Sequence, residues 1–404
     1  MMHKSEVLTA IFLVSIAGVT LSSPNALTAI STTMPTAGST ITPSAYAQTT
    51  TDSAANGTDS TNLTDLTDST SIPSSEASDT LFVGDIADDT IKIIDITDGE
   101  GQVFIAKNSG EGNSGEGGYR LQSPTGIIVV NDTLLVANQN ANTGKTGEIL
   151  KFDGETGDFE GFLVRHNDDE GPWAPRGIVV SPDGEILYVA SFEGRGSTKS
   201  DLAPGAILAY DTQTGEFQGS FTPDEGILPE GTEFHPRGLL FSPDDGLLYI
   251  SGTGDLTSDI RAGYVLTFDP ESEEFGLFVS SQDAPSLHRP EGLAFDSEGN
   301  LWATSFRASE DDTDKILAFN SEGELTNTIN LYESGNDRTF AQAILFGPDG
   351  DLFVPISNTG ELRRYDVDTG EYAVVTEAGN PLGAPWYLTF KNTDPSTLEY
   401  DSSD

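Results

Sequence analysis

The sequence predicts an all-β fold: a six-bladed β-propeller with four-stranded blades, preceded by a disordered N-terminal region. A short strand that ends in Asp or Asn recurs with spacings of 46 to 58 residues, and its final residues are Asp95, Asp153, Asp211, Asp269, Asn320 and Asp366. Two apolar strands precede most of these strands, and a weaker strand follows. A period of about 40–50 residues with four strand signals per unit is typical of propeller blades.

The first 78 residues lie outside this repeat. Residues 1–47 are expected to form a signal peptide region, because the apolar run at 7–21 has 15 residues, whereas a membrane span needs about 20. The small residues of "AYAQ" at 45–48 favour cleavage there; a cut near Ser22–Ser23 and an uncleaved anchor are the alternatives. Residues 48–78 are rich in Ser, Thr and Asp, which predicts a disordered stalk.

These features predict a secreted, extracellular or cell-surface protein, which meets a membrane only if the N-terminal segment stays as an anchor. Three sequons are then candidates for N-glycosylation. Asn56 and Asn62 lie in the expected stalk, and Asn131 lies inside the repeat region. Sequons in exposed segments of an exported chain are acceptors for glycan.

The propeller is expected over residues 79–404, and each blade has recognisable strands. The first strand follows Pro-x-Gly in "PTGIIVV", "PRGIVVS", "PRGLLFS" and "PEGLAFD", and "AQAILFG" fills the same place without that motif. The second strands are "LLVAN", "ILYVAS", "LLYIS", "LWATS" and "LFVPI". Both sets are continuous apolar runs, as expected for strands packed on two faces. Turns such as "SPDG" join the first strand to the second.

The two ends of the repeat region complement each other. The unit at 79–107 has three strands but lacks a first one, and Ala384–Phe390 is a lone first strand, "APWYLTF". Pairing the two would complete a sixth blade and close the ring, which removes two free sheet edges.

The quoted strands resemble NHL repeats and the blades of the SMP-30-like regucalcin/gluconolactonase family, and they are similar to streptogramin-lyase-type propellers. The resemblance covers most of 79–400 and implies six blades, but the fold hosts unrelated functions. It also implies that the residue before the Gly of each first strand, or the equivalent residue where that Gly is absent, faces the mouth of the channel. These residues are Thr125, Arg176, Arg237, Glu291, Gln342 and Trp386. The ends of the second strands add Asp85, Asn138, Ser191 and Ser305.

The resemblance also implies a candidate metal site. The gluconolactonase-like enzymes hold a divalent cation with carboxylate and amide oxygens at such positions, and Glu291 occupies a matching place. Their Asn-Gly strand start and early Glu are missing here, and Arg176 and Arg237 stand where oxygen ligands would be needed. The alternative for Glu291 is a salt bridge to Arg237 or Arg289.

Histidines offer a second metal hypothesis, because the streptogramin-lyase pattern pairs His with a Glu. His166, His235 and His288 all fall in loops that enter first strands, and His235 and His288 lie on adjacent blades. Imidazoles suit zinc or copper, but these histidines are equally suited to capping loops. The cofactor expectation is therefore either none or a divalent cation such as Ca²⁺, Mg²⁺ or Zn²⁺.

Charge excludes some partners and favours others. A formal net charge of −46 should repel nucleic acid and anionic lipid, and the absence of Cys excludes disulfides. Nine of the eleven arginines map to loops or strand starts on the mouth side: Arg120, Arg165, Arg176, Arg195, Arg237, Arg261, Arg289, Arg307 and Arg338. Guanidinium groups suit planar pairing with carboxylate or phosphate. Loop acids such as Asp168, Asp169 and Glu193 could instead neutralise them.

The sequence therefore predicts an exported propeller that binds a ligand or a protein surface through an arginine-rich channel mouth. The expected partner is an anionic small molecule, a saccharide or a protein surface. No Ser-His-Asp order, P-loop or dinucleotide fingerprint is present. The alternative is a divalent-metal-dependent lactonase, hydrolase or lyase of the gluconolactonase-like type.

Overall fold

The strands fall where the apolar runs predict them. The computed structural model describes residues 80–108, 118–194, 197, 202–254, 262–332 and 338–401. The expected signal region, the expected stalk, Asn56, Asn62, Arg195 and Arg261 lie outside these residues. Among the described residues, no helix is both long and apolar enough to cross a membrane.

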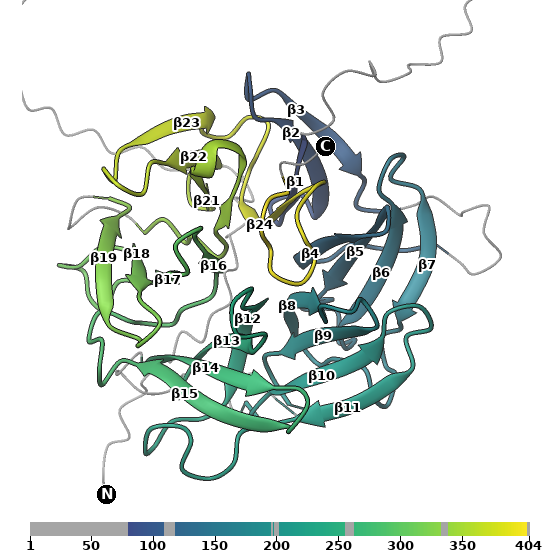
Figure 1. Cartoon of the computed structure of the whole chain (residues 1–404). Helices are drawn as coiled ribbons and strands as arrows, with labels where there is room; N and C mark the ends of the chain where they lie inside the picture. The colour runs from purple at the N-terminus through teal and green to yellow at the C-terminus, as the bar shows by residue number, and fades with distance from the viewer. Residues whose placement is uncertain are drawn as a thin grey trace, which may run out of the picture. The chain divides into compact units, whose positions relative to one another are not determined.

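The described strands form six antiparallel four-stranded sheets arranged in a ring (Figure 1). The first blade contains β24 (Pro385–Phe390), β1 (Thr80–Asp85), β2 (Thr90–Asp95) and β3 (Gly101–Ile105). The second contains β4 (Pro124–Val130), β5 (Thr133–Asn138), β6 (Glu148–Asp153) and β7 (Phe159–Val164). The third contains β8 (Pro175–Val180), β9 (Ile186–Ser191), β10 (Ala206–Asp211) and β11 (Phe217–Phe221).

The remaining blades follow the same order from the axis outward. The fourth contains β12 (His235–Phe241), β13 (Leu248–Thr253), β14 (Gly263–Asp269) and β15 (Glu274–Ser280). The fifth contains β16 (Leu293–Phe295), β17 (Leu301–Ser305), β18 (Lys315–Phe319) and β19 (Leu325–Asn330). The sixth contains β20 (Leu345–Phe346), the 3-10 turn η2 (Pro348–Gly350), β21 (Leu352–Ile356), β22 (Glu361–Tyr365) and β23 (Tyr372–Thr376).

The recurring Asp at the end of the third strand makes the hairpin turn. The Asp153 carboxylate accepts hydrogen bonds from the backbone N–H of Glu155 and Thr156, at 2.9 and 2.8 Å. Asp211 and Asp366 make the same pair of bonds to their own turns. These donors stabilise the ionised form and lower the pKa of each carboxyl. The repeated residue is therefore a turn-forming residue.

Ring closure occurs as the sequence predicts. β24 pairs antiparallel with β1, with Leu81 opposite Phe390 and Phe82 opposite Thr389. Asp85 at the end of β1 strengthens this junction, because its carboxylate accepts the backbone N–H of Gly383 at 2.6 Å and of Ala384 at 2.9 Å. The first blade thus joins the two ends of the described chain.

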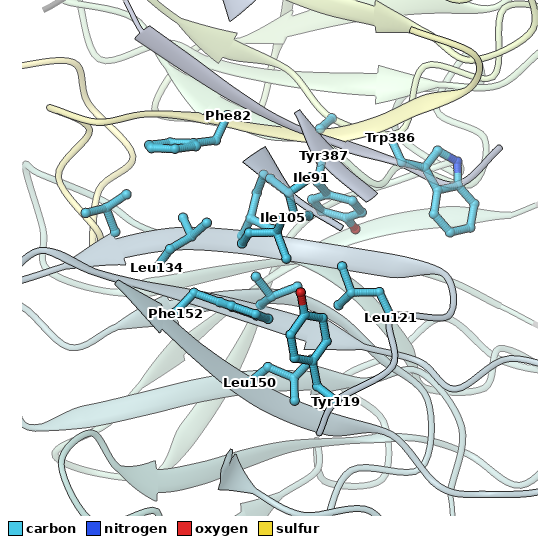
Figure 2. Packing of buried hydrophobic residues seen from close by; sticks show 14 residues of the cluster. Phe82, Ile91, Ile105, Tyr119, Leu121, Leu134, Leu150, Phe152, Trp386 and Tyr387 are labelled. Carbon is cyan, nitrogen blue, oxygen red and sulfur yellow. The ribbon is translucent and has the colours of Figure 1, made fainter. Parts of the chain in front are cut away.

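Hydrophobic clusters fill the spaces between neighbouring blades. In the cluster between the first and second blades, Phe82 and Ile91 of one sheet face Leu134 and Phe152 of the other (Figure 2). Trp386 belongs to the same cluster although it starts an inner strand. A single blade cannot bury both its faces, so repeating the hairpin around an axis is what creates these cores.

The chain after β24, at 391–401, closes one end of the central channel. We call this segment the plug, and the sequence pattern does not predict it. This segment crosses the middle of the ring (Figure 1), and its Pro395 and Ser396 carbonyls accept the backbone N–H of Val180 and Phe241. Its Leu398 packs against four of the hydrophobic clusters. Val180 and Phe241 end their inner strands, so the plug lies at the end opposite the Pro-x-Gly residues.

Candidate functional site

The Pro-x-Gly motif creates a bulge at the start of the inner strands. The pairing of β8 with β9 is interrupted between Pro175 and Ile178, and that of β12 with β13 between Pro236 and Leu239. β4 shows the same interruption. A bulge re-aims the side chain it carries, so the two-residue break turns the variable residue away from the sheet ladder.

The glycine of the motif lets neighbouring inner strands approach closely. A Cβ atom on Gly177 would lie 2.7 Å from the carbonyl oxygen of Arg237, and one on Gly238 would lie 1.9 Å from that of Glu291. No side chain fits at such distances, so only glycine allows the strands to approach this closely. The residues before these glycines consequently meet near the axis.

Glu291 is the centre of this meeting point, and its side chain is fully buried. Its Oε1 accepts hydrogen bonds from Arg176 Nη1 at 3.1 Å and from the Tyr387 hydroxyl at 2.9 Å. Its Oε2 accepts from Arg237 Nη1. Burial alone would raise the pKa of Glu291, but the charges of Arg176 and Arg237 outweigh it and lower the pKa. Burial and the Glu291 charge raise the pKa of Tyr387 well above its ordinary value.

Gln342 and Trp386 extend the hydrogen-bond network around Glu291. With its amide oriented to satisfy both neighbours, Gln342 donates to Glu291 Oε2 and accepts from Trp386 Nε1 at 3.3 Å. Five of the six predicted mouth residues therefore belong to one network: Glu291, Arg176, Arg237, Gln342 and Trp386. Tyr387, the residue after Trp386, was not among the predicted site residues.

Four arginines line one cleft at this end of the axis, which we call the arginine cleft. Its lining residues are Arg176, Arg237, Arg289, Phe306, Arg338, Phe340, Gln342 and Trp386. The space between them is about 10 Å³, which is room for about one water molecule. Arg176 and Arg237 lie at the starts of β8 and β12, whereas Arg289 and Arg338 lie in the segments before β16 and β20.

Aromatic rings support the guanidinium groups of the arginine cleft. Arg237 lies over the ring of Phe192 at 4.8 Å from its centroid, and Arg338 lies over Phe340 at 4.6 Å. Arg176 lies between the rings of Phe192 and Trp386, at 5.1 and 5.2 Å. A ring face holds a guanidinium by its plane and leaves the N–H groups at its edge available for hydrogen bonds.

Positive charge exceeds negative charge at the centre of the arginine cleft. Arg176 and Arg237 are both largely buried, with side-chain exposures of 12% and 4%, and they share the single carboxylate of Glu291. Burial disfavours the charged form of Arg237 and lowers its pKa, although the attraction of Glu291 opposes this shift. The Nε atoms of Arg176 and Arg237 are buried without a hydrogen-bond partner among the described residues.

Loop acids neutralise part of the rim. Arg338 Nη2 lies 3.5 Å from Asp314, whose carboxylate also accepts backbone N–H groups of the loop that carries Arg338. Burial raises the pKa of Glu193, against the attraction of nearby Arg176. In direct ion pairs among the described residues, Arg176 and Arg237 share the carboxylate of Glu291.

The candidates at the ends of the second strands hold loops. Asn138 accepts the backbone N–H of Gln122 at 2.7 Å, and Ser191 accepts that of Trp173 at 3.1 Å. Ser305 accepts the backbone N–H of His288 at 2.9 Å, and Asp85 holds the start of β24 as described above. The Thr125 hydroxyl, at an inner-strand start, is buried and donates to the carbonyl of Pro175 at 3.0 Å. Each fixes the entry to an inner strand.

The predicted metal ligands do not form a cation site with one another. Both oxygens of Glu291 accept hydrogen bonds from guanidinium groups, and a cation there would meet two positive charges. His235 Nδ1 lies 3.0 Å from the Phe192 carbonyl, and its Nε2 lies 3.3 Å from Glu233. Among the residues that the structure describes, no three His, Asp or Glu side chains are grouped as metal ligands. These residues do not fit a divalent cation.

Comparison with known proteins identifies the family. No curated protein sequence matches the chain. In fold, the chain is similar to a chain of a nidogen/laminin complex, with 12% identity, a TM-score of 0.53, and coverage of 77% of this chain and 97% of that one. A further likeness is to an inactive variant of virginiamycin B lyase from Staphylococcus aureus solved with quinupristin (16% identity, TM-score 0.45, coverage 76% and 87%).

Another likeness is to a putative 6-phosphogluconolactonase from Bacteroides fragilis (14% identity, TM-score 0.46, coverage 77% and 97%). At these identities the similarity concerns the fold. The family model described as SMP-30/gluconolactonase/LRE-like region matches residues 69–358, which is most of the chain. The chain therefore belongs to the SMP-30/gluconolactonase/LRE-like family.

Proposed function

We propose that this propeller is an exported binding protein that takes an anionic group into the arginine cleft. The observation that carries the proposal is the shared carboxylate: two buried guanidinium groups, Arg176 and Arg237, contact one buried Glu291. Buried charges in proteins are normally paired. A second anion, supplied by a ligand, would balance the remaining positive charge.

The geometry of the guanidinium groups suits a carboxylate or a phosphate. The guanidinium groups of Arg176 and Arg237 lie over aromatic rings, an arrangement that leaves N–H groups for hydrogen bonding. The buried Nε atoms of both residues lack partners among the described residues, and an anion at the cleft would supply acceptors. Charge-assisted hydrogen bonds of this kind contribute about 1.5–3 kcal/mol each.

The size of the cleft restricts the ligand. About 10 Å³ of space requires side chains to move apart before a carboxylate or phosphate enters. Arg289 and Arg338 lie outside the strands, so we infer that they are the side chains that move. We infer that one anionic group enters and that the rest of the ligand, such as the ring of a uronate or a sugar phosphate, stays outside.

Family membership favours a second candidate, a metal-dependent lactonase or related hydrolase. Its requirement is a set of oxygen ligands, and Glu291 is surrounded by guanidinium groups instead. Metal analysis of the purified protein, combined with a lactone-hydrolysis assay, tests this candidate directly. A stoichiometric metal whose removal abolishes hydrolysis would establish the enzyme and overturn the binding proposal.

Calorimetric titration with gluconate, glucuronate, glucose 6-phosphate and phosphate tests the binding proposal. We expect at least one of them to bind the parent, and the Arg176→Ala, Arg237→Ala double variant to lose roughly 100-fold or more in affinity, since two charge-assisted bonds disappear. Arg364→Ala is the matched control, because Arg364 is 44% exposed on β22, away from the cleft. Binding that survives the double substitution would refute the proposal.

The double variant leaves Glu291 buried without its two guanidinium partners, which costs about 3–5 kcal/mol and could prevent folding. The triple variant Arg176→Ala, Arg237→Ala, Glu291→Gln removes the buried carboxylate as well. It keeps the test informative where the double variant fails to fold, and it is expected to show the same loss of anion binding.

A further inference from the structure

A second pocket lies on the second blade and shares no lining residue with the arginine cleft. Its volume is about 570 Å³, within the range of small-molecule sites. Its walls come from the segment before β4, the loop between β5 and β6, and the residues around the end of β7. The side chains that matter for its chemistry are Arg120, Asn140, Lys145, Glu148 and His166. We call it the His166 pocket.

His166 is held by a buried carboxylate. Its Nδ1 lies 2.7 Å from Glu148 Oε2, and the Glu148 side chain is 4% exposed whereas that of His166 is 29% exposed. An ionised carboxylate can only accept a hydrogen bond, so Nδ1 must carry the proton. In neutral His166 the lone pair is then on Nε2, and Nε2 makes no hydrogen bond to a described residue.

The other oxygen of Glu148 is also fixed. Asn138 Nδ2 donates to Glu148 Oε1 at 2.7 Å and to the carbonyl of Arg120 at 2.9 Å. The backbone N–H of Gln122 donates to Asn138 Oδ1 at 2.7 Å, which determines the orientation of this amide. A chain of hydrogen bonds from Gln122 to His166 therefore sets the tautomer of the imidazole, as outer partners do for functional histidines.

Two cations complete the pocket. Arg120 and Lys145 are exposed side chains at its lining, on a protein with 65 acidic and only 19 basic residues. A metal cation at Nε2 would be repelled by these two charges, whereas an anionic group would be attracted. The Nε2 lone pair needs a hydrogen-bond donor, which a hydroxyl group supplies.

We propose that the His166 pocket binds a polyhydroxylated acid, a small molecule with several hydroxyl groups and one anionic group. A hydroxyl donates to His166 Nε2, and the anionic group lies beside Arg120 and Lys145. Neither feature alone is sufficient: a neutral sugar lacks the group that the cations attract, and inorganic phosphate lacks the carbon chain that places hydroxyls at the imidazole.

Nitrogen NMR of the histidines tests the tautomer. The full chain has 4 His, and His166→Gln assigns the signal. At about two pH units above the ordinary imidazole pKa of about 6.5, we expect the proton on Nδ1. Glu148→Gln should move it to Nε2, because Asn138 requires the amide oxygen and leaves the NH₂ facing Nδ1. A parent protein with the proton on Nε2 would overturn the inference.

The same signal reports on ligand binding at this pocket alone. We expect gluconate or glucose 6-phosphate to shift the His166 Nε2 resonance in a saturable manner, at least tenfold more strongly than glucose or inorganic phosphate. Arg120→Ala, Lys145→Ala should weaken the response at least tenfold and leave the tautomer unchanged. Both residues are exposed, so the variant should fold. The proposal fails if none of these ligands acts at about 10 mM, or if the double variant responds like the parent.

The outcome is independent of the arginine cleft. Arg176→Ala, Arg237→Ala removes the proposed function of the cleft but should leave the His166 response intact. A response lost in that variant and retained in Arg120→Ala, Lys145→Ala would assign the signal to the cleft and refute the second site.

Discussion

Arg237 meets three constraints at once: it is buried, it donates to Glu291, and its guanidinium group lies over the ring of Phe192. Lysine would keep the positive charge, but an ammonium group cannot form a planar pair of hydrogen bonds or stack on a ring in the same way. The shape of the guanidinium group is therefore expected to matter as much as its charge.

Arg237→Lys should lower the affinity for anions about tenfold, equivalent to about 1.4 kcal/mol. Calorimetric titration of the parent and the variant with the same carboxylate measures this, and Arg364→Lys serves as the control. Equal affinities for parent and Arg237→Lys would mean that charge alone attracts the ligand.

At the residue scale, the sequence predicted part of the site. The family resemblance implied inward positions for Arg176, Arg237, Glu291, Gln342 and Trp386. A salt bridge from Glu291 to Arg237 or Arg289 was the alternative to a metal site. The sequence could not show that Arg176, two blades away from Glu291, reaches the same carboxylate, because that contact crosses the axis. Nor could it show the buried hydroxyl of Tyr387, which depends on the bulge geometry of β24.

At the scale of elements, Asp85 stabilises the junction between β1 and β24. Burial alone would raise its pKa, but the N–H groups of Gly383 and Ala384, together with Lys92 at 2.6 Å, lower it. A lowered folded-state pKa stabilises the fold fully above the unfolded value of about 3.9, and this stabilisation is lost as the pH falls through the folded-state pKa.

Asp85→Asn should therefore reduce the free energy of unfolding by about 3 kcal/mol at neutral pH, since it breaks a buried ion pair. The difference between parent and variant should shrink below about pH 4, where the parent carboxylate also becomes protonated. Urea unfolding at several pH values measures both quantities. A difference that stays constant down to pH 3 would show that Asp85 is not the acid-sensitive group.

The plug formed after β24 is a second stabilising element. Leu398 contacts clusters from several blades, so Leu398→Ala should cost about 2 kcal/mol of unfolding free energy. Leu277→Ala, at a side chain that is 42% exposed, should change it by less than about 0.5 kcal/mol. Similar values for the two variants in urea unfolding would show that the plug contributes nothing.

Elements were predictable to the extent that their apolar runs were continuous. The strands of the second, third and fourth blades match the predicted segments closely. The inner strands of the fifth and sixth blades are shorter, Leu293–Phe295 and Leu345–Phe346, and in the sixth the Pro-x-Gly motif is missing. The plug escaped prediction because most of its sequence is polar, like that of a solvent-exposed tail, although Leu398 and Tyr400 pack against the hydrophobic clusters.

At the scale of the whole molecule, the six sheets and their clusters lie within residues 80–401. A chain that begins at Asp79 should therefore melt within about 1 °C of the longer chain, because it keeps all of the sheets and clusters of the described residues. Differential scanning calorimetry of the two chains provides the comparison. A drop of several degrees would mean that the first 78 residues stabilise the propeller.

The net charge of −46 makes the arginine cleft unusual, because an acidic protein has concentrated buried cations around one carboxylate. Glu291 is the internal counter-ion of Arg176 and Arg237, and under the proposed function it would compete with an incoming anion. A metal-dependent enzyme would need the same carboxylate as a ligand. The two interpretations therefore predict opposite effects for the same substitution.

Calorimetric titration of Glu291→Gln with the anion that binds the parent is the most direct test. Removing the competing carboxylate should tighten anion binding about tenfold or more, and the anion should raise the melting temperature of this variant more than that of the parent, because it fills the place of the lost charge. Unchanged or weaker anion binding by Glu291→Gln, with a hydrolytic activity that disappears, would contradict the account.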